Sequence, residues 1–177
     1  YFAAEPERMA RWAHLAPEDR FNIGIAWQGN PSRKIDVGRS IPLAEFAPLC
    51  AVPGVNLVSL QRTHGLEQLR ALPAGMTVVE PGADFDAGAD AFVDTAALMA
   101  QLDLVVCSDT AVPHLAGPLG RPTWVGVKWV PEWRWMLDRD DSPWYPSMRL
   151  FRQSRAGDWR GVFESMRDAL RARVDAG

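Results

Sequence analysis

The stretch LVVCSDTAVPHLAG, residues 104–117, decides the fold of this chain. An apolar run leads into a polar turn and then into a helical pattern, so Asp109 and Thr110 lie where a strand becomes a helix. In an open parallel sheet that junction is at the carboxyl edge, where ligands bind. A helix beginning there directs free N–H groups and its positive dipole end at the crevice, which suits phosphate. The stretch predicts a phosphorylated or nucleotide-linked ligand.

Strands and helices alternate along the rest of the chain. Apolar runs predict six strands, at residues 21–27, 55–60, 76–79, 104–107, 123–127 and 148–151. Helical spacing predicts helices at residues 43–50, 64–72, 94–102 and 111–119. A last helix is predicted from Asp158, with one apolar face made of Val162, Phe163, Met166, Leu170 and Val174. Such alternation indicates right-handed βαβ units. The predicted fold class is α/β, with a Rossmann-like parallel sheet of about six strands and helices on both faces.

Three prolines and one aspartate refine the helix predictions. Pro48 must bend or end the first helix, and Pro118 is expected to shorten the helix that follows residues 104–107. Pro113 is tolerable because a proline in the first turn loses no intrahelical hydrogen bond. Asp94 is expected to cap the third helix.

The chain divides into two expected parts. Residues 1–20 carry Met9 and Trp12 at helical spacing between Pro6 and Pro17, and are predicted to be a linker helix outside the core. Residues 21–177 are predicted to be the Rossmann-like domain, including the C-terminal helix. Within it, the Gly- and Asp-rich residues 82–93 are expected to form a surface loop.

Composition excludes several classes of partner. The net charge is −3 and there is no basic run, which argues against nucleic acid. No apolar stretch approaches the ~20 residues of a membrane span, and no signal peptide is visible. Cys50 and Cys107 lie in apolar segments without metal-type spacing, as expected for buried free thiols in a reducing compartment. We therefore expect a cytoplasmic protein.

The loop after the first predicted strand supplies candidate binding residues. Gln28, Gly29 and Asn30 follow the strand, and Gly29 permits close backbone approach. Arginine and lysine side chains farther along can pair with phosphate oxygens, and Ser40 adds a hydroxyl. The alternative is an ordinary solvated loop, which we favour for Arg33 and Lys34 but less for Arg39.

Each polar residue of residues 104–117 also has a structural interpretation. Asp109 is either a helix cap alone or a cap that also contacts the ligand, and we favour the second. Thr110 can present a hydroxyl and an N–H. His114 is either a satisfied, half-buried histidine or a secondary contact to phosphate or sugar.

A tryptophan-rich loop follows the fifth predicted strand. Its rings could stack on a base or a sugar, or pack as the core of a lid, and we favour packing for Trp135 and Trp144. Residues 138–141, DRDD, contain a D-x-D pattern that we interpret as solvated charge, so no metal is expected. The chain lacks G-x-G-x-x-G, a Walker motif and G-x-S-x-G, which argues against a dinucleotide enzyme and a hydrolase.

The chain resembles a known family. SDTAVPHLAGPLGRP resembles the signature of the heptosyltransferase-like glycosyltransferases, family nine. The match is closer to relatives fused to tetratricopeptide repeats, in which GIAWQGNP, RSIPL, VSLQ, DTAALMAQLDLV, PEWRW, DSPWYPSMRLFRQ and GDW recur in this order.

The resemblance implies the C-terminal, donor-binding half of a GT-B enzyme from a bacterium. In this family an inverting transfer of a sugar from a nucleoside diphosphate to a sugar or protein acceptor needs no metal and no cofactor. The catalytic base is expected in the N-terminal acceptor domain, which this sequence lacks, and residues 1–20 would connect the two domains. The residues that the resemblance assigns to the donor are Gln28, Gly29, Asn30, Arg39, Ser40, Asp109, Thr110, Ala111, His114, Pro131, Glu132 and Trp133.

Departures from the family pattern support a second hypothesis. Pro113 and Pro118 stand where helix formers are expected, and Lys128 adds a charge where the family is commonly apolar. These changes favour, as an alternative, a degenerate binding or scaffold module without transferase activity. An unrelated Rossmann-like enzyme that uses NAD or a phosphorylated metabolite is a third hypothesis, weakened by the missing glycine motif.

Overall fold

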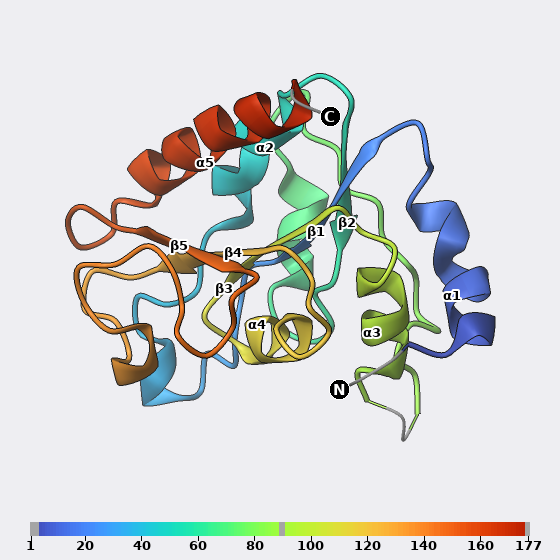
Figure 1. Ribbon diagram of the computed structural model, residues 1–177, viewed down its shortest axis with the longest axis horizontal. Coiled ribbons are helices and arrows are strands. Elements are labelled where there is room, and N and C mark those ends of the chain that lie inside the picture. Colours follow the sequence, from blue (N-terminus) through green and yellow to red (C-terminus); the bar gives the residue numbers. More distant parts are fainter. Residues whose placement is uncertain (1–3, 89–90, 176–177) are drawn as a thin grey trace.

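The computed structural model describes residues 4–88 and 91–175. Its centre is a sheet of five parallel strands in the order β2-β1-β3-β4-β5 (Figure 1). The strands are β1 (Phe21–Ala26), β2 (Val55–Ser59), β3 (Leu104–Ser108), β4 (Thr123–Val127) and β5 (Met148–Arg152). All five were predicted within one residue at each end. Every residue of β3 and β4 is buried, as expected for strands covered on both faces.

The sixth predicted strand, at residues 76–79, is wrong. This segment contributes one isolated parallel bridge, in which Val79 pairs with Val58 on the free edge of β2. The Val79 N–H donates to Leu57 O and Val79 O accepts from Ser59, each at 2.8 Å. Pro73 and Pro81 lie close on either side of the segment, and proline donates no hydrogen bond to a ladder. The bridge still lies where the third strand of a Rossmann-like sheet would lie.

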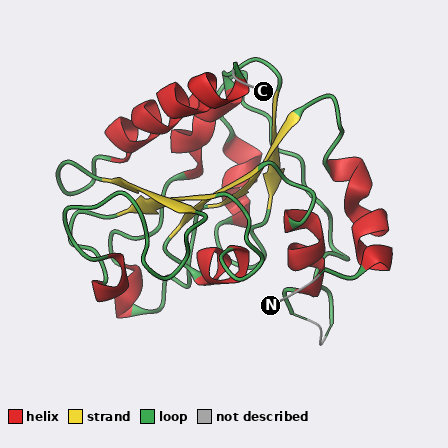
Figure 2. Cartoon of the chain, viewed as in Figure 1, coloured by secondary structure: helices red, strands yellow, loops and turns green. Residues whose placement is uncertain are grey.

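Helices cover both faces of the sheet (Figure 2). The α-helices are α1 (Pro6–Trp12), α2 (Ala47–Cys50), α3 (Val93–Met99), α4 (Ala111–Ala116) and α5 (Trp159–Val174). Short 3₁₀ helices are η1 (Ala13–Leu15), η2 (Lys34–Asp36), η3 (Leu43–Phe46), η4 (Leu66–Ala71) and η5 (Trp133–Trp135). In Figure 1, α2 and α5 lie over one face of the sheet, and α3 and α4 lie under the other.

Helix α5 follows its sequence pattern closely. The Asp158 side chain accepts a hydrogen bond from the Gly161 N–H at 3.1 Å and caps the helix. Its buried residues include Val162, Phe163, Met166 and Leu170, which were predicted to share one face. These residues belong to the core cluster on this face of the sheet, and α5 contacts α2 and β5.

The other helices depart from their predicted bounds for local reasons. Residues 43–50 divide into η3 and α2, because Pro48 fits the first turn of a new helix but not the interior of a continuous one. The prediction for residues 64–72 holds as η4, in 3₁₀ geometry. Helix α4 ends at Ala116, two residues before Pro118, which confirms that this proline shortens it.

Asp94 does not cap α3, so that prediction is wrong. The N-cap position is Phe92, and Asp94 lies inside the first turn, where its carboxylate accepts from the Asp86 N–H and from Arg8. Asp86 supplies the missing cap, because its carboxylate accepts from the Asp94 and Thr95 N–H groups. The loop at residues 82–93 is therefore anchored by buried Phe85 and Asp86, while residues 89–90 lie outside the described part.

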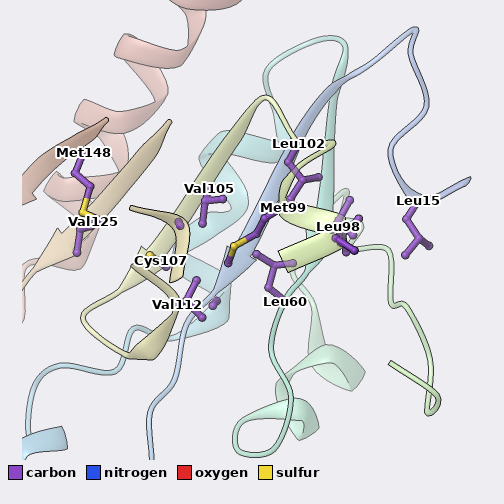
Figure 3. Close-up of a cluster of buried hydrophobic side chains, with 14 of the residues drawn as sticks. Leu15, Leu60, Leu98, Met99, Leu102, Val105, Cys107, Val112, Val125 and Met148 are labelled. Carbon is purple, nitrogen blue, oxygen red and sulfur yellow. The ribbon is translucent and has the colours of Figure 1, made fainter. Parts of the chain in front are cut away.

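The prediction that residues 1–20 lie outside the core is also wrong for the described residues 4–20. Trp12 and Leu15 are 4% and 5% exposed, and belong to the core cluster under α3 and α4. Figure 3 shows part of this cluster, from Met148 and Val125 at one end to Leu15 at the other. The Trp12 ring packs edge-on against Phe85 at 5.2 Å. Helix α1 is thus part of this globular unit, and its role as an inter-domain connector stays a prediction.

Candidate binding site

A pocket of about 380 Å³ opens at the carboxyl edge of the sheet. Its walls come from the segments after β1, β2 and β3, so it lies where connections from neighbouring strands leave in opposite directions. Open α/β sheets bind ligands at such switch points. We call it the edge pocket; its lining residues are Ala26, Gln28, Gly29, Asn30, Arg39, Leu60, Gln61, Arg62, Thr63, His64, Phe92, Thr110, Ala111 and Val112.

The structure divides the predicted site residues between two places. Gln28, Gly29, Asn30, Arg39, Thr110 and Ala111 line the edge pocket. His114 and Trp133 line a second pocket of about 310 Å³, which we call the aromatic pocket, together with Arg134, Trp135, Trp144 and Tyr145. Ser40, Asp109, Pro131 and Glu132 line neither of them.

Gln61 organises the edge pocket, and its role was not predicted. Its Oε1 accepts from the N–H groups of Trp27 (2.9 Å) and Gln28 (3.0 Å). Its Nε2 donates to the carbonyl oxygens of Gln28 (2.7 Å) and His64 (2.8 Å). One side chain therefore joins the loop after β1 to the loop after β2. The recurrence of VSLQ at the end of the second predicted strand was the signal in the sequence.

Arg39 reaches the pocket with its charge already compensated. Its guanidinium pairs with Asp36 at 3.3 Å, and both side chains are largely buried. The Ser40 hydroxyl donates to the same carboxylate and accepts from the Gly29 N–H at 3.1 Å. A Cβ on residue 29 would lie 2.6 Å from Arg39 Nη2 and 2.7 Å from Asp36 Oδ1. Gly29 thus leaves room for the Arg39–Asp36 ion pair. The sequence predicted that the missing side chain lets a ligand approach, whereas in the structure it lets another part of the chain approach.

Arg62 is a second cation at the edge pocket, and it was also missed. Its Nη2 donates to the Asp86 carbonyl oxygen at 2.9 Å, and no ion pair joins it to a described carboxylate. A carbonyl oxygen satisfies one of five guanidinium N–H donors but does not neutralise the charge. Arg62 therefore offers more charge to an anion in the pocket than Arg39 does.

Thr110, and not Asp109, caps α4. Thr110 is the N-cap of α4, with its Oγ1 accepting from the Val112 N–H, and its own N–H donates to Ser108 O. Asp109 is 7% exposed, and its carboxylate makes no hydrogen bond to another described residue. Asp109 is therefore not the cap. Its oxygens are not among the fully buried polar atoms that lack a partner, and Asp109 lines neither pocket, so contact with a ligand stays a prediction from the sequence.

The aromatic pocket is built on α4 and the loop between β4 and β5. The Trp135 ring stacks on His114 at 5.7 Å, and Nδ1 of His114 lies 3.3 Å from the Tyr145 hydroxyl. Trp135 is buried, as predicted, whereas the packing predicted for Trp144 is wrong, because Trp144 is 53% exposed. The Glu132 carboxylate accepts from the Arg134 N–H and pairs with its side chain, so it stabilises its own turn.

Burial and the nearby positive charge of Arg134 lower the pKa of His114 below its ordinary value. Asp109 and Glu132 act in the opposite direction but do not cancel the effect. His114 is therefore neutral near pH 7, with one ring nitrogen free to accept a hydrogen bond and the other to donate.

This shift makes stability depend on pH. As pH falls through about 6.5, the ordinary histidine value, the unfolded chain gains a proton at residue 114 before the folded chain does. The free energy of unfolding is therefore expected to be higher at pH 7.5 than at pH 5.5, and His114→Gln should reduce the difference. Urea unfolding at pH 5.5 and at pH 7.5 measures this difference in the free energy of unfolding. An unchanged difference in His114→Gln would contradict the assignment.

The remaining polar clusters have simple partners. Asp141 of the D-x-D segment pairs with Arg139 at 2.6 Å, and among the described residues no group of three or more His, Cys, Asp or Glu side chains could hold a metal ion. Cys107 is buried, Cys50 is half-buried, and neither forms a disulfide. Within residues 4–88 and 91–175, no helix has the length and apolar character needed to cross a membrane.

The chain is similar to a known protein in sequence and to solved glycosyltransferases in fold. No family model matches the chain. Protein FlbA of Caulobacter vibrioides is 30% identical over 181 residues, which covers 97% of this chain and 29% of FlbA.

Solved glycosyltransferases have the same fold. ADP-heptose lps heptosyltransferase II of E. coli aligns with 98% of this chain, with a TM-score of 0.60 and 18% identity. The glycosyl transferase family 9 structure from Veillonella parvula covers 94% of it (TM-score 0.58, 14% identity), and E. coli heptosyltransferase WaaC with ADP covers 90% (TM-score 0.56, 15% identity). The chain shares its fold with glycosyltransferases. It spans 54%, 45% and 48% of these three structures, about half of each.

Proposed function

We propose that this domain is the donor-binding half of an inverting, metal-independent GT-B glycosyltransferase. The observation that carries the proposal is the edge pocket, which lies at the switch point of a sheet shared with a heptosyltransferase solved with ADP. A nucleoside diphosphate sugar would bind there, and an acceptor hydroxyl from a sugar or a protein would attack its anomeric carbon.

The residues of the pocket would act on the diphosphate and the sugar. Arg62 is the cation that we expect to contact the diphosphate, since its charge is not neutralised by a carboxylate. Arg39 would mainly hold the loop after β1, because Asp36 compensates its charge. Asp109 lies between β3 and the pocket-lining Thr110, and its carboxylate would accept a hydrogen bond from a hydroxyl group of the donor. Charge that develops on the departing diphosphate would be stabilised by Arg62 and the polar groups around it.

Calorimetric titration with ADP, GDP, UDP, CDP and TDP tests the proposal. We expect one of them to bind with the same affinity in Mg²⁺ and in EDTA. Arg62→Gln should weaken that binding about tenfold to a hundredfold, the value of a hydrogen bond to a charged group. Arg33→Gln, which changes an exposed arginine of the loop after β1 that does not line the pocket, is the matched control and should change affinity much less. The corresponding nucleoside, which lacks phosphates, should bind both variants equally well.

Two results would contradict parts of the proposal. Equal losses in the two arginine variants would contradict the assignment of Arg62 to the diphosphate. Binding of none of the five diphosphates would favour the degenerate scaffold module, which is supported by the short α4 and by a Thr110 whose N–H and hydroxyl are engaged within the chain.

Further parts of the proposal concern the whole protein. We propose that the catalytic base belongs to a separate acceptor domain, that residues 1–20 lead into it, and that tetratricopeptide repeats accompany the pair. A bacterial, cytoplasmic protein that binds no nucleic acid fits this proposal. These are expectations from the sequence resemblance, since the chain covers 29% of FlbA and about half of the solved structures.

A further inference from the structure

The aromatic pocket has the composition of a carbohydrate site. Its six lining residues are His114, Trp133, Arg134, Trp135, Trp144 and Tyr145. Aromatic faces cover the C–H groups of a sugar ring, and ring N–H and O–H groups bond to its hydroxyls. Trp133 and Trp144 are 69% and 53% exposed and meet edge to face at 6.3 Å, so indole surface remains open at the mouth of the pocket.

The walls of the pocket are held in place by specific contacts. A Cβ on residue 117 would lie 2.3 Å from Tyr145 Cδ1, so Gly117 allows the tyrosine ring to pack on α4. The Trp144 indole N–H donates to Arg134 O at 3.1 Å and joins the two sides of the loop. The pocket is therefore formed before any ligand binds.

One polar group in these walls lacks a partner. Trp135 is 1% exposed, and its buried indole N–H makes no hydrogen bond within the described part of the chain. Buried indole N–H groups usually have a partner. His114 Nδ1 and the Tyr145 hydroxyl bond to each other at 3.3 Å, which leaves Nε2 of His114 and the second bonding position of the hydroxyl for a ligand. This donor-rich, aromatic surface suits a ring that carries several hydroxyl groups.

The order of pockets along the sheet edge favours a sugar over a nucleobase. Arg62 and Gln61 separate the edge pocket from a third pocket of about 220 Å³ that contains Glu80 and lies on the β2 side. The aromatic pocket lies on the opposite side, where Thr110 faces the edge pocket and His114 the aromatic one. In a nucleotide sugar the diphosphate lies between the nucleoside and the sugar. With the diphosphate in the edge pocket and the nucleoside in the pocket that contains Glu80, the sugar reaches the aromatic pocket.

We propose that the aromatic pocket binds a pyranose ring, an inference that rests on the proposed function for the direction of the donor. The ring is either the glycosyl group of the donor or a sugar of the acceptor. Both have the same chemistry, and the test distinguishes them.

The eight tryptophans provide the readout. In ¹⁵N-labelled protein, methyl pyranosides of glucose, galactose, mannose and N-acetylglucosamine are titrated at millimolar concentrations, and Trp135→Phe identifies the Trp135 indole signal. We expect at least one pyranoside to shift that signal to saturation. Trp144→Ala should weaken its binding about tenfold. Trp129→Ala, which removes an exposed indole of the same loop from outside the pocket, should have no effect.

The source of the sugar follows from a second titration. If the pyranose belongs to the donor, its nucleoside diphosphate conjugate should bind about tenfold tighter than the diphosphate alone, and Trp144→Ala should remove the difference. If it belongs to the acceptor, the free pyranoside should still bind when the conjugate is saturating.

Several outcomes would overturn the inference. One is that no pyranoside moves the Trp135 signal; another is that a nucleoside moves it instead. A diphosphate that binds while every pyranoside fails would leave the proposed function standing without this site. Pyranoside binding without diphosphate binding would preserve the sugar site and contradict the proposed function.

Discussion

Replacing Gln61 with leucine is expected to dismantle the edge pocket. Leucine has a similar volume but removes both hydrogen-bonding atoms, so four backbone groups lose their partner: the N–H groups of Trp27 and Gln28 and the carbonyl oxygens of Gln28 and His64. A buried polar group left without a partner costs about 1–3 kcal/mol, and water can reach part of this site. We expect the free energy of unfolding to fall by about 2–4 kcal/mol.

The effect on binding should exceed the effect of any single contact. Gln28 and His64 both line the edge pocket, and among the described residues only the Gln61 side chain bonds to the backbone of both. Without it the loops after β1 and β2 keep the hydrogen bonds from Trp27 Nε1 to Gly65 O and from Gln68 Nε2 to Gln28 Oε1, so we expect the loops to loosen and a nucleoside diphosphate to have to reorder them on binding. Affinity for the diphosphate identified by calorimetry should fall at least tenfold, in a protein that remains folded by circular dichroism.

Gln101 offers a matched control. Its Nε2 donates to Met9 O (2.9 Å) and Ala97 O (3.1 Å), away from the edge pocket. Gln101→Leu makes the same chemical change and should reduce stability without changing affinity. If Gln61→Leu also left affinity unchanged, Gln61 would be a structural residue of no consequence for the pocket. The stability measurement holds whether or not a nucleotide is the ligand.

The second large effect is expected for Trp12→Ala. Trp12 is 4% exposed in the core cluster under α3, and its ring packs edge to face against Phe85. Truncating a buried tryptophan to alanine costs about 3–5 kcal/mol, a large part of the roughly 5–15 kcal/mol that stabilises a domain. Chemical denaturation should therefore show a strongly lowered midpoint, or a chain that is already partly unfolded in buffer.

An exposed tryptophan provides the comparison. Trp129 is 54% exposed, and Trp129→Ala should change the free energy of unfolding by no more than about 0.5 kcal/mol. Similar small effects for both variants would mean that α1 is a detachable connector, as the sequence first indicated. A large effect for Trp12 alone would extend the folding unit to include α1, whose Arg8 also pairs with buried Asp94 at 3.0 Å.

Local sequence patterns were sufficient for most of the fold. The five strands were predicted within one residue because each is a short run of apolar residues bounded by polar or turn-forming ones. The face of α5 was predicted because its 3.6-residue periodicity lies within one segment. The same logic placed Gln28, Gly29 and Thr110 together, since carboxyl ends of parallel strands meet at one edge.

Tertiary structure alone decided the features that depend on distant contacts. Gln61 acts on residues 33 and 34 positions away, and the burial of Trp12 depends on Phe85, so no local window contains either pair. Charge compensation likewise depends on geometry. The sequence pointed to Arg39 and missed Arg62, but Asp36 pairs with Arg39, whereas a carbonyl oxygen leaves Arg62 charged. Periodicity reports which side of an element is apolar, whereas the partner of a side chain is determined only when the elements pack.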